Sequence, residues 1–178
     1  MPAHRAETLA AGDFATWLGS IGQALRDGTD SAVPCGACTA CCSAGMFIHV
    51  GPDEAAARAA IPADLLVPAP GLPDGHSVMG HDRDGRCPML VDGSCSIYDH
   101  RPQACRTYDC RVFTATGVVD ADPARAGVME RASRWRFDYA DAAAREQQAS
   151  LLAAAATGQE PNPLGRALTA IAMSKTRG

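Results

Sequence analysis

Hydrophobic and polar positions predict helices at both ends of the chain. Near the N-terminus, one helical face collects Phe14, Trp17, Leu18, Ile21 and Leu25. Asp13 can cap this helix and Gly28 can end it. Toward the C-terminus, Asp122 followed by Pro123 predicts the start of a helix that runs to about Thr157, with Gly158 as its stop. A last helix is expected after Asn162-Pro163.

The middle of the chain predicts short elements separated by turns. Short strands are expected at 46–50, 77–79 and 89–91, and short helices at 53–60 and 102–106. The segment 62–75 is rich in proline and glycine, which indicates a loop or lid. Turns are expected at 80–85 and at Asp92-Gly93. Together these patterns predict a small, helix-rich α+β domain with short strands and a loop-rich centre that bound metal holds together.

Composition narrows the class of protein. The chain has 178 residues and a formal net charge of −4, which argues against a general nucleic-acid binder because such proteins need a basic surface. No apolar run approaches the ~18 residues of a membrane span, and the N-terminus lacks the apolar core of a secretory signal. We therefore expect a cytoplasmic protein that binds neither nucleic acid nor membrane.

Cysteine distribution predicts three segments. All eight cysteines fall between Cys35 and Cys110. The expected parts are an N-terminal helical leader at 1–34, a metal-binding body at 35–120 and a C-terminal helical segment at 121–178 packed on that body. The apolar faces of the leader and tail helices leave room for a homodimer or for a protein partner.

The cysteine spacing points to metal chemistry. A first set is Cys35-x2-Cys38-x2-Cys41-Cys42, and the second set is Cys87, Cys95, Cys105 and Cys110. Clustered cysteines in a chain without an export signal bind metal or do redox chemistry more often than they form disulfides. A Cys-x2-Cys turn places two sulfurs on one side of a tight loop, where Gly36 relieves the backbone. Without a cation, neighbouring thiolates would repel one another, so these cysteines would stay protonated as thiols.

Two metals fit this pattern. Eight cysteines can fill two tetrahedral zinc sites of four thiolates each. The triple Cys-x2-Cys-x2-Cys, with a remote cysteine followed by proline, is also the spacing of bacterial ferredoxins and favours a [4Fe-4S] cluster. One partition groups Cys35, Cys38, Cys41 and Cys87 in one site and leaves Cys42, Cys95, Cys105 and Cys110 for a second, although spacing does not give ligand connectivity.

Charged and histidine residues accompany the second set of cysteines. Arg101, Arg106 and Arg111 can offset the negative charge of a thiolate-ligated cluster, and Arg101 and Arg106 are the candidate cofactor-contacting residues. The alternative is surface salt bridging with Asp99 and Asp109. Histidines also flank the cysteines, but a lone histidine is more often a polar loop residue. We therefore do not predict His49, His81 and His100 as metal ligands.

These motifs carry a family resemblance. The first cysteine run, then Cys87-Pro-Met-Leu, then Cys95-Ser-Ile-Tyr-x2-Arg-Pro-x2-Cys105-Arg, resembles the YkgJ-type cysteine-cluster family, also called the CxxCxxCC or putative zinc- or iron-chelating domain family. Its members are small bacterial proteins, often labelled iron–sulfur oxidoreductases, and a related cluster occurs in flagellin lysine methylases. The resemblance covers about residues 35–110, implies metal binding, and leaves Cys110 outside the general pattern.

Three functions follow as hypotheses. The first is an iron–sulfur protein for electron transfer or for support of a modification reaction. The second is a zinc-stapled structural or binding module. The third is an accessory or catalytic component of peptide or protein modification, with the 62–75 loop and the histidines beside a substrate pocket. No Gly-x-Gly-x-x-Gly, P-loop or His-Glu-x-x-His motif occurs, so catalytic residues and enzyme status stay open.

Overall fold

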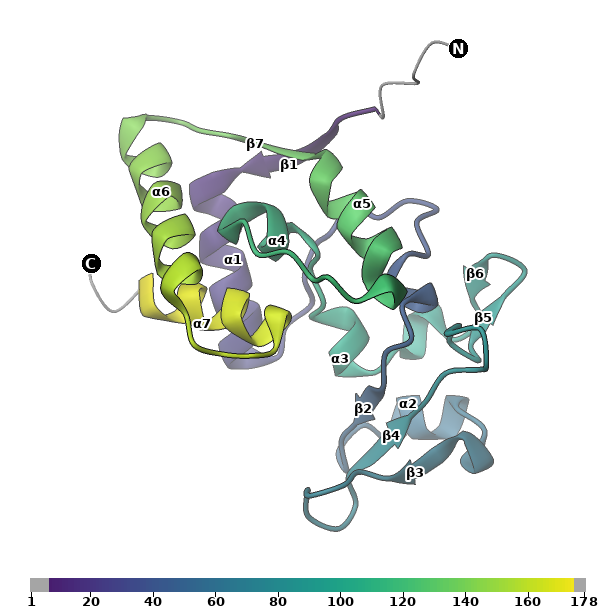
Figure 1. Cartoon of the computed structure of the whole chain (residues 1–178). Coiled ribbons are helices and arrows are strands. Elements are labelled where there is room, and N and C mark those ends of the chain that lie inside the picture. The colour runs from purple at the N-terminus through teal and green to yellow at the C-terminus, as the bar shows by residue number, and fades with distance from the viewer. Residues whose placement is uncertain (1–6, 175–178) are drawn as a thin grey trace. The chain divides into compact units, whose positions relative to one another are not determined.

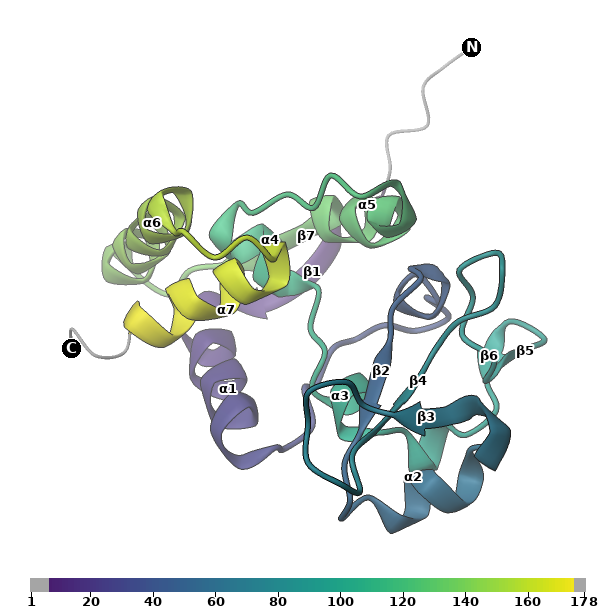
Figure 2. The same ribbon diagram turned by 60° about the horizontal axis from the view of Figure 1, so that its bottom comes forward.

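The computed structural model describes residues 7–174 and divides the chain into two compact units. Unit 1 contains residues 7–23, 109–122 and 128–174 of the described part, and unit 2 contains Ala24–Tyr108 and Pro123–Gly127. Unit 1 therefore combines segments from both ends of the sequence, whereas the cysteine-rich middle forms most of unit 2 (Figures 1 and 2).

Helices and one two-stranded parallel sheet build unit 1 (Figure 1). Its elements are β1 (Leu9–Asp13), α1 (Phe14–Asp27, up to Gln23 in this unit), α4 (Arg111–Thr116), α5 (Ala126–Arg134, from Val128 in this unit), β7 (Trp135–Asp138), α6 (Ala142–Thr157) and α7 (Pro163–Ser174). Strands β1 and β7 pair with Leu9 opposite Trp135, and the register shifts between Ala10 and Gly12.

The predicted N-terminal helix is confirmed as α1. The Asp13 carboxylate accepts a hydrogen bond from the backbone N–H of Thr16 at 2.9 Å, which is the N-cap interaction expected from the sequence. This bond lowers the pKa of Asp13. Most of the predicted apolar face is buried, with Phe14, Trp17, Leu18 and Ile21 at most 3% exposed, whereas Leu25 is 43% exposed. Phe14 meets Phe137 edge to face with ring centroids 5.3 Å apart.

The long helix expected from 123 to 157 is wrong, because a strand divides it. A short 3-10 turn at Pro123–Arg125 and helix α5 come first, then β7, and then α6. Within β7, Trp135 and Phe137 are buried while Arg136 and Asp138 are exposed, so the side chains alternate with the period of a strand. The expected ends are confirmed: α6 stops at Thr157 before Gly158, and α7 begins at Pro163.

A buried polar network links three parts of unit 1. The Asp109 carboxylate accepts a hydrogen bond from the indole Nε1 of Trp17 at 2.9 Å and pairs with the Arg111 guanidinium at 2.8 Å. Arg111 also donates to the Ala11 carbonyl oxygen at 3.1 Å. Both charged side chains are at most 8% exposed, so each depends on the other for compensation.

Unit 2 is built from short strands and single-turn helices. Its main elements are η1 (Cys41–Ser43), β2 (Ile48–Val50), α2 (Ala55–Ala60), η2 (Ala63–Leu65), β3 (Leu66–Pro68), β4 (Ser77–Met79), β5 (Leu90–Val91), β6 (Ser94–Cys95), η3 (Tyr98–His100) and α3 (Gln103–Arg106). Strand β4 is the centre of an antiparallel sheet of order β2-β4-β3 (Figure 2). Val50 and Met79 of this sheet form a small buried core with Ala57, Ile61 and Met89, and Cys87 packs against this core.

The expected short elements of unit 2 are mostly confirmed. Strands occur within 46–50, 77–79 and 89–91, and short helices within 53–60 and 102–106. The Asp92-Gly93 turn joins β5 to β6, with φ of 48° and 76° as a type I′ hairpin requires. The segment 62–75 is not wholly a loop, because Leu66–Pro68 pairs with β4 as an edge strand. Pro68 ends that strand, and proline is tolerated on an edge strand because its missing N–H is not needed for strand pairing.

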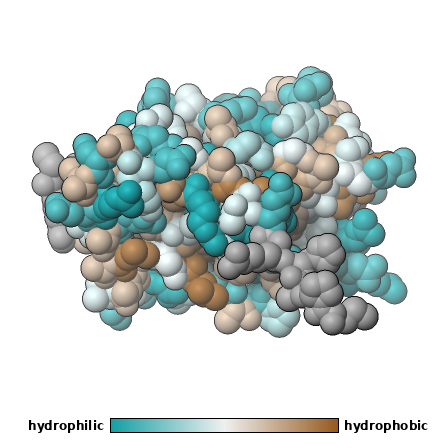
Figure 3. All heavy atoms as spheres, turned by 90° about the horizontal axis from the view of Figure 1, so that it is seen from above, coloured by the Kyte–Doolittle hydropathy of each residue, from teal (hydrophilic) through white to brown (hydrophobic). Residues whose placement is uncertain are grey.

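The described residues are 47% helix and 13% strand, so the predicted helix-rich α+β class is confirmed. In the part of the chain that the structure describes, no helix is long and apolar enough to cross a membrane. On the face shown in Figure 3, hydrophilic and apolar residues are interspersed, and the strongly apolar areas are small.

Candidate metal centre

Seven of the eight cysteines lie in unit 2 and reach it from separate segments. Cys35 and Cys38 lie on the loop before η1, Cys41 and Cys42 are on η1, Cys87 follows β4, Cys95 is on β6 and Cys105 is on α3. Cys35 is exposed and the others are half-buried. The eighth, Cys110, precedes α4 and belongs to unit 1.

The first Cys-x2-Cys turn has the backbone expected of a ligand loop. The N–H of Cys38 donates to the carbonyl oxygen of Cys35 at 3.1 Å, which closes a four-residue turn. Gly36 occupies this turn with φ of 57°, a left-handed conformation in which a side chain would be strained. The glycine singled out in the sequence therefore has the conformational role proposed for it.

Backbone pairing joins the first cysteine run to the segment around Cys87. Cys87 N–H donates to the Cys42 carbonyl oxygen at 2.7 Å, and Gly45 N–H donates to the Gly85 carbonyl oxygen at 2.8 Å. Arg125 in the 3-10 turn before α5 donates to the Ala44 carbonyl oxygen. Residues 40 or more positions apart are thus held at fixed spacing by two main-chain hydrogen bonds and one from an arginine side chain.

Five thiols form one electrostatic group, defined as the inner cysteines: Cys41, Cys42, Cys87, Cys95 and Cys105. Cys41 hydrogen-bonds to Cys42, and this bond, burial and the Cys42 charge raise the pKa of Cys41. The same bond lowers the pKa of Cys42, against burial and the charges of three other inner cysteines.

Burial acts in the same direction on two further inner cysteines. It raises the pKa of Cys87, with the charges of Cys95 and Cys41 adding to the effect. It raises the pKa of Cys105 to about 12, to which the charges of Cys41, Cys87 and Cys95 also contribute. Thiols in this position stay protonated at neutral pH unless a cation stabilises their thiolates.

The two candidate arginines have different surroundings. The positive charge of Arg101 opposes the rise in the pKa of Cys105, so this guanidinium acts electrostatically on one of the inner cysteines. Arg101 also stacks over the Tyr98 ring, 3.7 Å from its centroid. Arg106 donates to the Arg101 carbonyl oxygen at 3.1 Å and forms an ion pair with Asp30 at 2.6 Å.

Helix α3, which carries Cys105, is anchored at both ends. The Glu54 carboxylate accepts hydrogen bonds from the N–H of Gln103 at 2.5 Å and from the N–H of Gly51 at 2.7 Å. At the other end, the Arg106 carbonyl oxygen accepts from Ser31 N–H at 2.8 Å. The first contact spans 49 residues, and no local motif marks it, so the sequence alone did not reveal this role of Glu54.

The side chains of the remaining candidates are engaged in other contacts. The sulfur of Cys110 accepts a hydrogen bond from the Trp135 indole at 3.2 Å. The ring of His49 hydrogen-bonds to His76 at 2.8 Å, and His81 contacts the Asp82 carbonyl oxygen through Nδ1 at 2.8 Å. Among residues 7–174, no three His, Cys, Asp or Glu side chains are placed closely enough to hold a metal ion.

The cysteine-bearing part of the chain matches a known protein family. Residues 34–121 match the model of the CxxCxxCC family, described as "Putative zinc- or iron-chelating domain". This part of the chain is a domain of the CxxCxxCC family. The resemblance drawn from the cysteine spacing is thereby confirmed. No curated protein and no solved structure matches the chain.

The CxxCxxCC domain contains all eight cysteines and both candidate arginines. The family description supports metal binding by a cysteine cluster, with zinc or iron as the metal. Thiolate donors suit either metal. The raised pKa values of Cys41, Cys87 and Cys105 fit this chemistry, since a bound cation would stabilise the thiolates that burial opposes.

Proposed function

We propose that this CxxCxxCC protein holds an iron–sulfur cluster on the cysteines of unit 2 and uses it for electron transfer or to support a modification reaction. The observation that carries the proposal is the electrostatic grouping of the inner cysteines. They come from four separate segments, and each contributes to the pKa shift of at least one other. Half-buried thiols in such a group are stable as thiolates only with a cation.

A single centre is favoured over two independent four-cysteine sites. The division suggested by spacing separates Cys41 from Cys42, yet these neighbours hydrogen-bond to each other. Both of them also act on, or respond to, Cys87 and Cys105. We therefore place the ligands in one group, of which four thiolates would hold a [4Fe-4S] cluster. The inner cysteines are the first choice for these four, and Cys35 and Cys38 are the alternative donors.

Arg101 gives the proposed centre a means of charge compensation. A thiolate-ligated cluster is net negative, and when bound it supplies a one-electron redox couple. The Arg101 guanidinium acts on Cys105 and is oriented by stacking on Tyr98, whose side chain is 59% exposed. An exposed aromatic ring beside a charged residue is a contact surface suited to a protein or peptide partner.

Zinc is the second candidate because of the size of unit 2. The buried core cluster of this unit has five residues, and its strands are two or three residues long. Small units of this kind gain much of their stability from a structural metal. In this alternative the metal replaces core packing, and the role of the protein is to bind a partner.

Metal and acid-labile sulfide analysis of protein purified without oxygen tests both candidates. Iron with matching sulfide, and absorption from sulfur-to-iron charge transfer, is the expected result. Zinc without sulfide supports the structural alternative. Substoichiometric amounts of both metals, from protein that is folded and fully reduced, contradict metal binding at this centre.

A further inference from the structure

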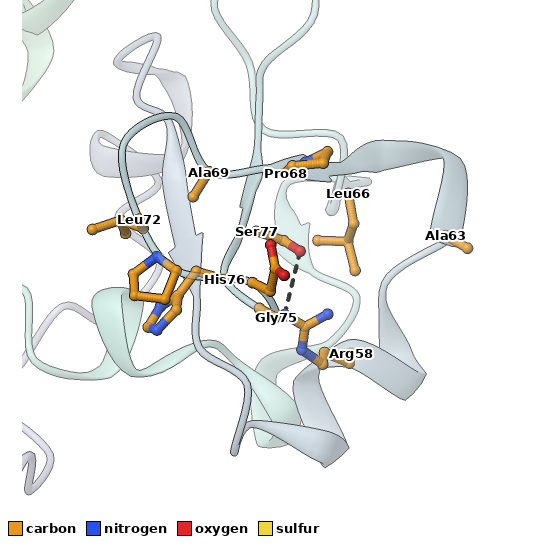
Figure 4. A pocket seen from close by; sticks show the side chains of 11 residues that line it. Arg58, Ala63, Leu66, Pro68, Ala69, Leu72, Gly75, His76 and Ser77 are labelled. Atoms are coloured by element: carbon orange, nitrogen blue, oxygen red, sulfur yellow. Dashed lines mark hydrogen bonds between the residues drawn. The ribbon is translucent and has the colours of Figure 1, made fainter.

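Unit 2 contains a cavity separate from the proposed metal ligands. It has a volume of about 550 Å³ and lies along the 62–75 segment, between α2, β3 and the start of β4 (Figure 4). This size is within the range of small-molecule sites in proteins. Its walls are mainly apolar, with Leu66, Pro68, Leu72 and Pro73 among them, and its charged lining residues are Arg58 and Asp74.

Arg58 is a rigid positive group in this cavity. Its Nε donates to the Gly51 carbonyl oxygen at 3.0 Å. Its Nη2 donates to the carbonyl oxygens of Val50 and Gly75. It also donates to the Ser77 hydroxyl oxygen at 3.2 Å (Figure 4). These acceptors are neutral, and within residues 7–174 no carboxylate lies within 4.0 Å of the guanidinium. Its positive charge is thus fixed in place but not compensated.

Asp74 is the negative group lining the same cavity. Within the described residues its carboxylate has no hydrogen bond or ion pair, to Arg58 or to any other residue. Opposite charges that share a cavity without forming an ion pair leave a space between them. A ligand that carries both charges, with an apolar group for the walls, would compensate each one.

The loop between β3 and β4 is held in shape by its own contacts. Ala69 N–H donates to the His76 carbonyl oxygen at 3.0 Å, and His76 N–H donates to the Pro73 carbonyl oxygen at 3.3 Å. The His76 ring is held by its hydrogen bond to His49 at 2.8 Å. The cavity therefore has a preformed wall, which lowers the entropic cost of binding.

We propose that this cavity binds a free α-amino acid with an aliphatic side chain, such as leucine. The ligand carboxylate accepts from Nη1 of Arg58, which has no partner among the described residues, and from the Ser77 hydroxyl. The ligand ammonium group donates to Asp74. The aliphatic side chain packs against Leu66 and Leu72.

Three matched probes test this assignment by equilibrium dialysis against the full-length protein with its native metal bound. Leucine carries both charges, 4-methylpentanoate lacks the ammonium group, and 3-methylbutylamine lacks the carboxylate. We expect leucine to bind about tenfold more tightly than either analogue, since each charged hydrogen bond contributes on that scale. No leucine binding, or equal binding of all three probes, overturns the proposal.

Variants of Asp74 and Ser77 separate the contributions of the ammonium and carboxylate contacts to ligand affinity. Asp74 lies on an exposed loop, so Asp74→Asn leaves the core intact. This variant should weaken leucine binding about tenfold and leave the binding of 4-methylpentanoate unchanged. Ser77→Ala should weaken both carboxylate-bearing probes, and Asp64→Asn, on an exposed 3-10 turn outside the cavity lining, is the control. Unchanged leucine binding in Asp74→Asn contradicts the assignment, even if Arg58 variants fail to fold.

Discussion

The backbone N–H of Cys87 donates to the carbonyl oxygen of Cys42 over 2.7 Å. This contact connects the CxxCxxCC run to the distant Cys-Pro segment without using a side chain. Because the main chain fixes the spacing, the two sulfurs can change protonation or ligation while their backbones stay in place. Metal binding at this centre therefore depends on the thiols, and the scaffold that holds them has its own hydrogen bonds.

Replacing an inner cysteine should remove the metal, whereas replacing Cys110 should not. We expect Cys41→Ser and Cys87→Ser to lose most of the bound metal, because a neutral hydroxyl is a poor substitute for a thiolate. Cys110→Ser removes a sulfur that accepts from Trp135, so it should cost about 1 kcal/mol of stability and keep the metal. Metal content per folded chain is the measurement.

Two outcomes of the cysteine variants would contradict the ligand assignment. If Cys110→Ser loses metal as fully as Cys41→Ser, while both stay folded by circular dichroism, Cys110 is a ligand. If all three variants keep full metal content, the inner cysteines do not hold the metal.

Metal affinity should increase with pH. Burial and neighbouring charges raise the pKa of Cys87 and Cys105, and the hydrogen bond to Cys42 raises that of Cys41. These thiols are protonated in the metal-free protein at pH 7 and must lose protons to coordinate, so lower pH opposes binding. The apparent affinity should rise about tenfold per pH unit for each proton released.

Competition of reduced, metal-free protein with a zinc chelator at pH 6.5 and 7.5 measures this slope. Calorimetry in two buffers of different ionisation enthalpy counts the released protons independently. A flat affinity over this range would mean that the ligands are already thiolates without metal, contrary to the effect of burial.

Elements with a strong local signal were predictable from the sequence. Asp13 before an amphipathic run predicted α1, and Asp92-Gly93 predicted the turn that follows β5, although the partner strand β6 was not predicted. Pro163 gave the start of α7. The cysteine spacing predicted the family, described as zinc- or iron-chelating, because ligand spacing is a local property.

Long-range pairing was not predictable. Strand β7 follows α5 directly and lies in an Ala- and Arg-rich stretch that reads as helix, yet Trp135 and Phe137 pair with the N-terminal β1. Tertiary contact overrides the local helical preference at these positions. The grouping of residues 7–23 with 128–174 in one unit has the same cause. The Arg58–Asp74 cavity likewise depends on contacts between α2 and the start of β4.

Breaking the buried pair in unit 1 should destabilise the protein strongly. Asp109→Asn leaves Arg111 buried without a counterion, so we expect a loss of about 3 kcal/mol. Trp17→Phe removes one hydrogen bond to the same carboxylate and should cost about 1.5 kcal/mol. Urea unfolding measures both values, and Glu130→Gln on the exposed side of α5 is the control with no expected change.

The double variant tests whether these residues act as one network. Contacting residues should show non-additive effects, so the Asp109→Asn/Trp17→Phe variant should lose less than the sum of the two single losses. Strict additivity would show that the indole and the guanidinium interact with Asp109 independently.

Removing the Glu54 carboxylate should loosen the helix that carries Cys105. Glu54→Ala leaves the N–H groups of Gln103 and Gly51 without their acceptor, and should cost about 1–2 kcal/mol. We expect faster transfer of the metal to a chelator, because Cys105 is two residues from Gln103. Asp53→Ala, the exposed neighbouring carboxylate, should keep the wild-type transfer rate. Equal rates for both variants would show that α3 does not depend on this contact.

Arg101 should tune the redox potential if the centre is an iron–sulfur cluster. Its positive charge acts on Cys105, and a nearby cation stabilises the more negative, reduced state. Arg101→Gln should therefore lower the midpoint potential, by about 1 kcal/mol or about 40 mV for one electron. Arg101→Lys keeps the charge but loses the planar group stacked on Tyr98, so its potential should stay near that of the wild type.

Protein-film voltammetry of the wild type and the two variants decides between charge and stacking. Equal downward shifts in both variants would assign the effect to stacking. No shift in either variant would place Arg101 outside the electrostatic environment of the cluster.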